Sequence, residues 1–417
     1  MFIHGAILSA DIVSWLYEKA RFYPNISQVL EELVERTREA GMLVDRMWIS
    51  IPVLHPSLRA KGFHWTLEKG VELRYYRGEP ALEQMYLNSP LKVVHDTGES
   101  VRLQITQEAQ ENEFGIVPDL REAGFTDYIA MPLVFSEATP GTVSMATRES
   151  VGFNDADILA FETIAQPLSM LCEAQALKEK AETVLNTYVG PRAGARVLNG
   201  EIKRGDGERI SAIVGFADLR GFTQLSNQLP SDKIIELLNI YFGAMSEAVE
   251  RNGGEVLKFI GDEVLSVFPY ENEEGARVAA MQALLTAKET MQGIQRANDT
   301  SCPMLPDLRL GMGLHAGDVF FGNVGGETRL DFTVVGPTVN KASRIAGLSK
   351  DLNQDILTSK EFADILGCHA GALGSYYLKG FEEPQPVFTA PEHGSDCKTE
   401  EGKLAWDAYG ALKTNAS

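Results

Sequence analysis

The chain has 417 residues and a net charge of -20, and 44% of its residues are hydrophobic, as in a soluble globular protein. This length exceeds one ordinary core and predicts two domains with a connector. The negative charge excludes nucleic acid or an anionic membrane surface as the main partner, because each phosphate contact needs a cation. No apolar run reaches the ~18 residues of a membrane-spanning helix, and Asp11 interrupts the apolar N-terminus, so we expect a cytoplasmic protein.

The cysteines are widely spaced and form no pattern. They are Cys172, Cys302, Cys368 and Cys397. This spacing disfavours a disulfide framework and a zinc cluster, so we expect reduced thiols.

The first part of the chain has the pattern of an α/β domain. A helical stretch begins near Val29 and is followed by alternating residues in MLVDRMWISI, which predict a strand. FHWTLEKGVELRYYR predicts two strands around a turn, and YIAMPLVF and GTVSMAT predict two more around a turn at Thr139-Pro140-Gly141. We expect a central antiparallel sheet over roughly 25 to 170 and assign residues 1–153 to this domain.

A long helix is predicted from Asn154, a good N-cap, to about Tyr188. Pro167 should kink this helix. Its apolar residues form a heptad-like seam with one phase slip, at 161, 164, 168, 171, 174, 177, 181, 184 and 188. The seam predicts either a helix packed on its own domain or a parallel dimer helix that carries a signal. Residues 189–209 are rich in glycine and basic side chains and predict a hinge, so 154–209 form the connector.

The segment ISAIVGFADLRGFTQLS reads as a buried strand that ends at Asp218, a turn at Arg220-Gly221, and a helix that begins with Phe222-Thr223. A carboxylate beside the free amides of a helix start can hold Mg²⁺ while the amides receive phosphate oxygens. Taken alone, Asp218 fits a helix cap equally well.

The segment GGEVLKFIGDEVLSVFP predicts a hairpin with Gly261-Asp262 at its tip, covered on one face by a helix over Ser231–Arg251. Acidic residues at a hairpin tip are usually turn chemistry. A second aspartate after a buried strand, 44 residues beyond Asp218, favours a pair that binds two metal ions.

The segment DFTVVGPTVNKASR predicts a strand that passes into a helix with Pro337 near its first position. Asn340 and Arg344 are four residues apart and share one helix face, so both side chains can reach one bound group. The alternative is that Arg344 pairs with a surface acid while Asn340 faces water.

In this order, FADLRGFT, LKFIGDE and FTVVGPTVNKASR closely resemble the catalytic domain of class III adenylate and guanylate cyclases, over about 210–390. The resemblance implies a ferredoxin-like βαββαβ fold within an α/β (α+β) chain. It also implies that Asp218, Asp262 and the Leu219 carbonyl bind two Mg²⁺ ions, or Mn²⁺ in their place. One ion would help the ribose 3′-OH attack the α-phosphorus, and the other would steady the triphosphate.

The same resemblance assigns the substrate contacts. Gly221, Phe222 and Thr223 at the start of the helix would contact phosphate. Lys258 and Thr333 would contact the purine, and Asn340 would contact the ribose. Arg344 would contact the α-phosphate, and Lys379 would contact the triphosphate. Lysine at position 258 favours adenine, because guanylate cyclases tend to carry Glu there.

Members of this family build each site across a dimer interface, so the resemblance implies a homodimer whose lone subunit is inactive. The helix over 155–188 is then well placed to set how the two halves meet. The N-terminal region more weakly resembles a GAF-type sensor, which would take an unknown small-molecule ligand. Trp48, His64 and Trp65 could line its pocket, but aromatic residues in such strands are more often core. His64 as a haem or metal ligand is a minor alternative.

The sequence therefore predicts a homodimeric adenylate cyclase that converts ATP to 3′,5′-cyclic AMP and pyrophosphate, with a polar tail over 391–417. Guanylate cyclase is the related alternative. A diguanylate cyclase is disfavoured, because KFIGDEVLSVF lacks the second glycine of that family's GGDEF motif and the family has no counterpart of TVNKASR. A pseudoenzyme whose sensor is the active part is the alternative of a different class.

Overall fold

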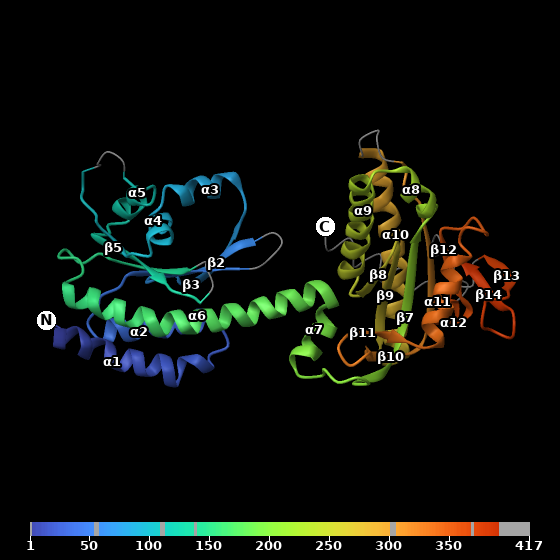
Figure 1. Cartoon of the computed structure of the whole chain (residues 1–417), viewed down its shortest axis with the longest axis horizontal. Helices are drawn as coiled ribbons and strands as arrows, with labels where there is room; N and C mark the ends of the chain where they lie inside the picture. The colour runs from blue at the N-terminus through green and yellow to red at the C-terminus, as the bar shows by residue number, and fades with distance from the viewer. Residues whose placement is uncertain are drawn as a thin grey trace. The chain divides into compact units, whose positions relative to one another are not determined.

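The computed structural model describes residues 2–53, 58–108, 113–136, 140–300, 306–367 and 371–391. The predicted turn residue Thr139, three of the cysteines (Cys302, Cys368 and Cys397) and residues 392–417 of the predicted tail lie outside the described residues. The chain divides into two compact units, Met1–Val184 and Leu185–Ser417 (Figure 1). None of the described helices is long and apolar enough to cross a membrane.

The first unit is built on a six-stranded sheet with the order β3-β2-β1-β6-β5-β4, in which every neighbouring pair is antiparallel. This confirms the predicted central antiparallel sheet. Its strands are β1 (Arg46–Pro52), β2 (Leu58–Thr66), β3 (Gly70–Arg77), β4 (Val101–Gln104), β5 (Asp127–Leu133) and β6 (Gly141–Thr147). Its helices are α1 (Phe2–Glu18), α2 (Ile26–Glu39), α3 (Pro80–Leu87), α4 (Pro90–Thr97), α5 (Val117–Glu122) and most of α6 (Asp155–Val189), with a 3-10 turn over Ala20–Phe22.

The two faces of this sheet differ in chemistry. One face is apolar and carries Met47, Ile49 and Met145 into a core that α2 and α6 cover. In Figure 1, α3, α4 and α5 lie on the opposite side of the sheet from α2 and α6. Because side chains alternate along a strand, the residues between those core positions, such as Arg46 and Trp48, project to this second face.

The predicted apolar seam of α6 divides into a buried half and an exposed half. The side chain of Asn154 accepts hydrogen bonds from the amides of Ala156 and Asp157 (2.8 and 3.1 Å), which confirms the N-cap, and Pro167 lies inside the helix. The first half of the predicted seam packs into the core of its own unit: Phe161, Ile164 and Leu168. The second half exposes large apolar side chains to solvent: Leu177, Val184 and Tyr188, preceded by Met170.

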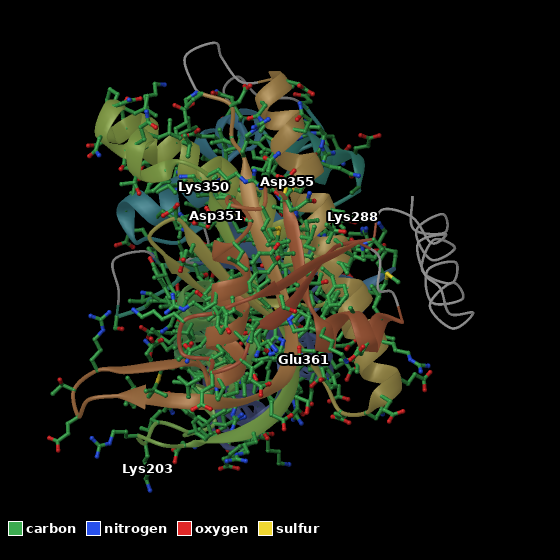
Figure 2. The ribbon with its side chains drawn as sticks, turned by 90° about the vertical axis from the view of Figure 1, so that its right-hand side faces the viewer. Lys203, Lys288, Lys350, Asp351, Asp355 and Glu361 are labelled. Atoms are coloured by element: carbon green, nitrogen blue, oxygen red, sulfur yellow. The ribbon has the colours of Figure 1, made fainter. Side chains whose placement is uncertain are left out.

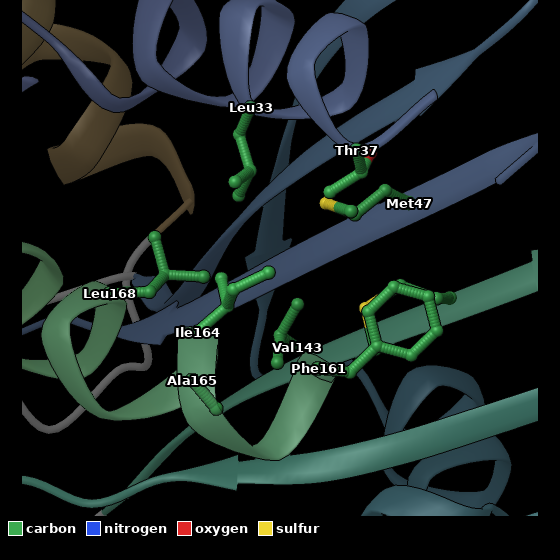
Figure 3. A pocket seen from close by; sticks show the side chains of 9 residues that line it. Leu33, Thr37, Met47, Val143, Phe161, Ile164, Ala165 and Leu168 are labelled. Atoms are coloured by element: carbon green, nitrogen blue, oxygen red, sulfur yellow. The ribbon is translucent and has the colours of Figure 1, made fainter. Parts of the chain in front are cut away.

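A small apolar pocket lies where α2, β1, β6 and α6 meet, and Figure 3 shows its lining, which includes Leu33, Met47 and Phe161. Its volume of about 10 Å³ is the space of a single water molecule, so it is a packing gap. The predicted pocket residues Trp48, His64 and Trp65 do not line it. Trp65 belongs to the core, as the more ordinary reading of these aromatic residues predicted.

The second unit contains an eight-stranded sheet with the order β13-β14-β12-β10-β7-β9-β8, in which β11 pairs only with β10. Its strands are β7 (Gly207–Leu219), β8 (Glu255–Ile260), β9 (Glu263–Tyr270), β10 (Leu310–Gly325), β11 (Leu330–Val335), β12 (Ile356–Ser359), β13 (Ala372–Tyr376) and β14 (Gln385–Thr389). Its helices are α7 (Pro191–Leu198), α8 (Phe222–Gln228), α9 (Ser231–Arg251), α10 (Glu273–Thr300), α11 (Pro337–Gly347) and α12 (Lys360–Leu366).

The segment expected to be a hinge, residues 189–209, is largely ordered into regular structure. It contains α7 and the first residues of β7. The carboxylate of Glu255 in β8 accepts a hydrogen bond from the amide of Arg192 (3.1 Å), and Ala193 is fully buried in a core with Val214. The sequence did not predict α7. A helix this short is stabilised by packing against the rest of the domain, and its small residues and glycine give no helical pattern that would indicate this packing.

Candidate active site

Two carboxylates meet at one end of the second sheet. Strand β7 pairs with β9 up to Ala217 opposite Val264, so Asp218 follows directly beside the β8–β9 turn that carries Asp262. Burial and the neighbouring carboxylates of Asp262 and Glu263 raise the pKa of Asp218 to about 7. Among the described residues, neither carboxylate forms an ion pair with a lysine or arginine. The site therefore concentrates negative charge that no nearby side chain neutralises.

Tyr241 lies beneath this acidic pair. It projects from α9 and is fully buried, and its hydroxyl has no hydrogen-bond partner among the described residues. Burial and the charges of Asp218, Asp262 and Glu263 raise its pKa, so the hydroxyl stays protonated. The sequence predicted a helix over Ser231–Arg251 but gave position 241 no role. A hydroxyl at a core position was the one signal that could have marked it.

The acidic pair fits a divalent cation. Its donors are all oxygen, and the raised pKa of Asp218 reflects burial beside the carboxylate of Asp262, an arrangement in which a cation favours the charged form of both groups. In the part of the chain that the structure describes, no three histidine, cysteine or acidic side chains form a closed metal cluster. Asp218, Asp262 and the Leu219 carbonyl would thus leave coordination positions open for a substrate, as catalytic metal sites require.

A helix start adjoins the pair. Gly221 has a left-handed backbone (φ 77°) and caps α8, whose first residues are Phe222 and Thr223. A residue with a Cβ is strained in this conformation, which accounts for glycine here. The first amides of a helix have no partner within the helix and attract anions. The structure thus places the three predicted phosphate contacts within five residues of Asp218.

Lys258 and Thr333, the predicted purine contacts, have unlike surroundings. Lys258 of β8 forms an ion pair with Asp331 of β11, and burial lowers its pKa. Thr333 is buried, with 6% exposure. Asp331 and Thr333 are two residues apart on one strand and therefore share a face. The sequence analysis did not name Asp331, although this alternation beside Thr333 could have identified it.

Helix α11 presents Asn340 and Arg344 together. Its buried face carries Ala342 and Ile345, and both predicted site residues are exposed on the other side. Among the described residues no acid lies within ion-pair distance of Arg344, so the ion pair of the alternative is not found, while Asn340 is exposed as that alternative expected. Arg344 does lie close enough to lower the pKa of Glu263, which burial and Asp262 raise overall. Arg344 therefore lies within electrostatic reach of Glu263, the residue that follows Asp262.

A buried polar network anchors α11, and sequence reasoning missed it. Lys341, beside Asn340, is 6% exposed, and its Nζ binds Glu361 Oε1 at 2.6 Å. Nδ1 of His315 lies 2.8 Å from Ser359 Oγ and 3.6 Å from Glu361 Oε2. Glu361 is labelled in Figure 2. The network ties the helix that carries Asn340 and Arg344 to β10 and α12.

Lys379 lies apart from these groups. It is exposed in the loop between β13 and β14, next to Leu378, which is buried. No described contact joins Lys379 to Asp218, Lys258 or Arg344. Its predicted triphosphate contact would therefore need a substrate that reaches it or a second subunit.

Comparison with known proteins agrees with this geometry. The family model of the adenylate and guanylate cyclase catalytic domain matches residues 208–389. An adenylate cyclase of Anabaena cylindrica is 31% identical over 187 residues, which are 44% of this chain and 36% of that protein. An uncharacterized protein of Mycobacterium tuberculosis strain H37Rv is 29% identical over 215 residues, 50% of this chain and 38% of that protein.

Among solved structures, the adenylyl cyclase CyaB from P. aeruginosa is similar over 46% of this chain and 98% of its own, at 29% identity and a TM-score of 0.40. The chain spans little more than a third of the length of the curated relatives it matches. The similarity falls on the part of the chain that carries the acidic pair and the Asn340–Arg344 face. Residues 208–389 are an adenylate and guanylate cyclase catalytic domain.

Proposed function

We propose that this chain is an adenylate cyclase, which converts ATP to 3′,5′-cyclic AMP and pyrophosphate in a homodimer. The observation that carries the proposal is the acidic pair of Asp218 and Asp262, which forms no ion pair among the described residues and lies beside the helix start at Gly221. The name of the Anabaena cylindrica relative, adenylate cyclase, supports the same activity.

The chemistry assigns a task to each side chain. Asp218, Asp262 and the Leu219 carbonyl would hold two Mg²⁺ ions, or Mn²⁺, which ease ionisation of the ribose 3′-OH and neutralise the triphosphate. The start of α8 receives phosphate oxygens, Asn340 orients the ribose, and Arg344 stabilises the charge that grows on the α-phosphate. The bond from O3′ to the α-phosphorus forms, the bond from that phosphorus to the bridging oxygen breaks, and pyrophosphate leaves.

Lys258 and Asp331 supply the hydrogen-bond donor and acceptor that recognise the purine base. Lys258 donates to adenine N1, and Asp331, its ion-pair partner, is the acceptor nearest to it for the adenine amino group. Buried Thr333 lines the same strand face. The pair also suits guanine, which offers O6 as an acceptor and N1–H as a donor. Guanylate cyclase is therefore the second candidate function.

The whole-chain organisation follows from this assignment. We infer a GAF-like sensor over 1–153, a signalling helix and connector over 154–209, and the catalytic domain over 210–390. The catalytic core runs β7, α9, β8, β9, α10, β10 with sheet order β10-β7-β9-β8, which supports the ferredoxin-like assignment. The exposed half of α6, with Leu177 and Val184, supports a dimer helix.

The test is direct turnover. Purified full-length chain is incubated with ATP or GTP and Mg²⁺, and the nucleotides are separated by chromatography. Cyclic AMP formed faster than cyclic GMP supports the proposal, and the reverse order selects guanylate cyclase. If neither product forms under Mg²⁺ or Mn²⁺ while the chain is folded and dimeric, the catalytic domain acts as a pseudoenzyme.

A further inference from the structure

The second face of the N-terminal sheet carries a group of polar and aromatic side chains that the catalytic assignment does not use. Cross-strand pairing sets His64 opposite Trp48 and Arg74 opposite Gly62, and Arg46 begins the same central strand as Trp48. We call the residues Arg46, Trp48, His64, Arg74 and Tyr76 the Arg46 patch. Arg74 is exposed at the edge of the sheet, and the other members are half-buried.

Arg46 forms no ion pair among the described residues. Its Nε donates a hydrogen bond to Nε2 of His64 at 2.9 Å. Within the described residues no carboxylate lies within 4 Å of the guanidinium, and its two terminal nitrogens donate to no described side chain or carbonyl. Burial lowers its pKa, and the charge of Asp119 opposes this shift. A guanidinium remains charged in proteins, so it needs an acceptor from elsewhere.

His64 adds a second donor. Because Nε2 accepts a hydrogen bond from Arg46, the proton of the neutral ring must lie on Nδ1. Burial and the charge of Arg46 lower the pKa of His64 to about 4, so the ring is neutral at physiological pH. Nδ1 is buried without a hydrogen-bond partner among the described residues, and Glu72 Oε2 lies 4.0 Å away. Glu72 is already engaged by Arg74 at 3.2 Å.

Two aromatic rings border these donors. Trp48 and Tyr76 meet edge to face, with ring centroids 6.1 Å apart. They lie against the backbone at Gly62, where a Cβ would come within 2.5 Å of Trp48 Nε1 and 2.7 Å of Tyr76 Cε2. Only glycine leaves room for both rings at this position. The patch thus combines a cation that has no ion-pair partner among the described residues with two half-buried aromatic rings.

We propose that the Arg46 patch is a binding site for a small aromatic carboxylate, whose carboxylate pairs with Arg46 and whose ring packs on Trp48 and Tyr76. A carboxylate matches the planar fork of the guanidinium and accepts two hydrogen bonds from it. Arg74, at the rim, is already paired with Glu72 (3.2 Å), so Arg46 supplies the positive charge of the site. This site shares no residue with the cyclase chemistry and stands independently of it.

The test is ligand-observed ¹⁹F NMR of the full-length chain with 4-fluorobenzoate as the probe. We expect saturable binding, and we expect Arg46→Gln to raise Kd about tenfold or more, because it removes a charge-assisted pair. Arg46→Lys keeps the charge and should fall between the two. The matched control Arg77→Gln removes an exposed arginine from the same strand as Arg74 and should leave Kd unchanged.

Two further probes separate the parts of the proposal. Acetate carries the charge without the ring and 4-fluorobenzyl alcohol carries the ring without the charge, so both should bind more weakly than 4-fluorobenzoate. Thermal melting tests whether each variant is folded. If Arg46→Gln is unfolded, the Kd of Arg46→Lys is compared with that of the native chain instead. The proposal would be overturned if 4-fluorobenzoate did not bind at concentrations up to about 10 mM. It would also be overturned if the native chain, Arg46→Lys and Arg46→Gln all bound the probe with the same affinity.

Discussion

The two units of this chain contain opposite kinds of uncompensated charge. In the catalytic unit, Asp218 and Asp262 lie side by side, and neither forms an ion pair with a lysine or arginine among the described residues. In the N-terminal unit, Arg46 is a half-buried cation without a carboxylate in ion-pair range among the described residues. Burying a charge without a partner costs free energy, so each arrangement fits a bound group of opposite sign. One fits divalent cations with a polyphosphate, and the other fits a small organic anion.

The largest effect on the catalytic unit should come from removing Arg344, the cation that we assign to the α-phosphate. We expect Arg344→Ala to lower kcat by about 10²- to 10³-fold with a small change in KM, because Arg344 acts on charge that grows in the transition state. Lys350→Ala, an exposed lysine just beyond α11 and labelled in Figure 2, is the control and should retain activity. A loss confined to KM would contradict the assigned role.

Mixing inactive chains tests whether the acidic pair and Arg344 are supplied by different subunits. Asp262→Ala lacks one part and Arg344→Ala the other, so a mixed dimer would contain one complete site. We expect the mixture to recover activity that neither variant has alone, measured by cyclic nucleotide formation after the subunits exchange. No recovery, with exchange shown by a tagged partner, would mean that each site lies within one chain.

Reversing the charges of Lys258 and Asp331 tests whether this pair recognises the purine base. Lys258→Glu should lower ATP turnover about 10- to 100-fold, because it replaces the donor to adenine N1. Lys258→Glu with Asp331→Lys restores an ion pair of reversed direction between β8 and β11. If the pair only stabilised the fold, the double variant would recover ATP turnover. We expect it to recover the melting temperature but not the ATP preference, assayed against GTP.

The network that anchors α11 predicts how stability depends on pH. Burial lowers the pKa of His315 to about 4, below its unfolded value, with Lys341 adding to the shift and Glu361 opposing it. As pH falls from about 6.5 to 4, the unfolded state gains a proton that the folded state refuses, so stability falls. We expect His315→Gln to remove about 2 kcal/mol of this loss. Urea unfolding of both proteins at pH 7.5 and 4.5 gives the difference, and identical pH dependence would refute it.

The smallest effect should come from the exposed half of α6. Leu177→Glu places a charge in the apolar row that we assign to the dimer helix and should weaken association by about 1 kcal/mol. Thr187→Glu adds the same charge outside that row and should have less effect. Analytical ultracentrifugation measures both. Equal dimerisation of the two variants would assign α6 to its own unit alone.

The same two regions show what the sequence could predict. Asp218, Asp262, Asn340 and Arg344 fall in short segments whose local pattern gives a strand end, a hairpin tip and a helix face, and the structure has each of these elements. The Arg46 patch is assembled from three strands, so its charge imbalance appears only when the register is known. Tyr241 and Asp331 escaped notice for the same reason, because their partners are distant in sequence.

The acidic pair is tested most directly by calorimetric titration of Mg²⁺ into the chain with a non-cyclisable ATP analogue, followed by turnover of ATP. The native chain should bind Mg²⁺ and form cyclic AMP. Asp262→Ala should lose cation binding and lower turnover by about 10³-fold or more while remaining folded and dimeric. Cation binding and turnover that survive this substitution would contradict the account.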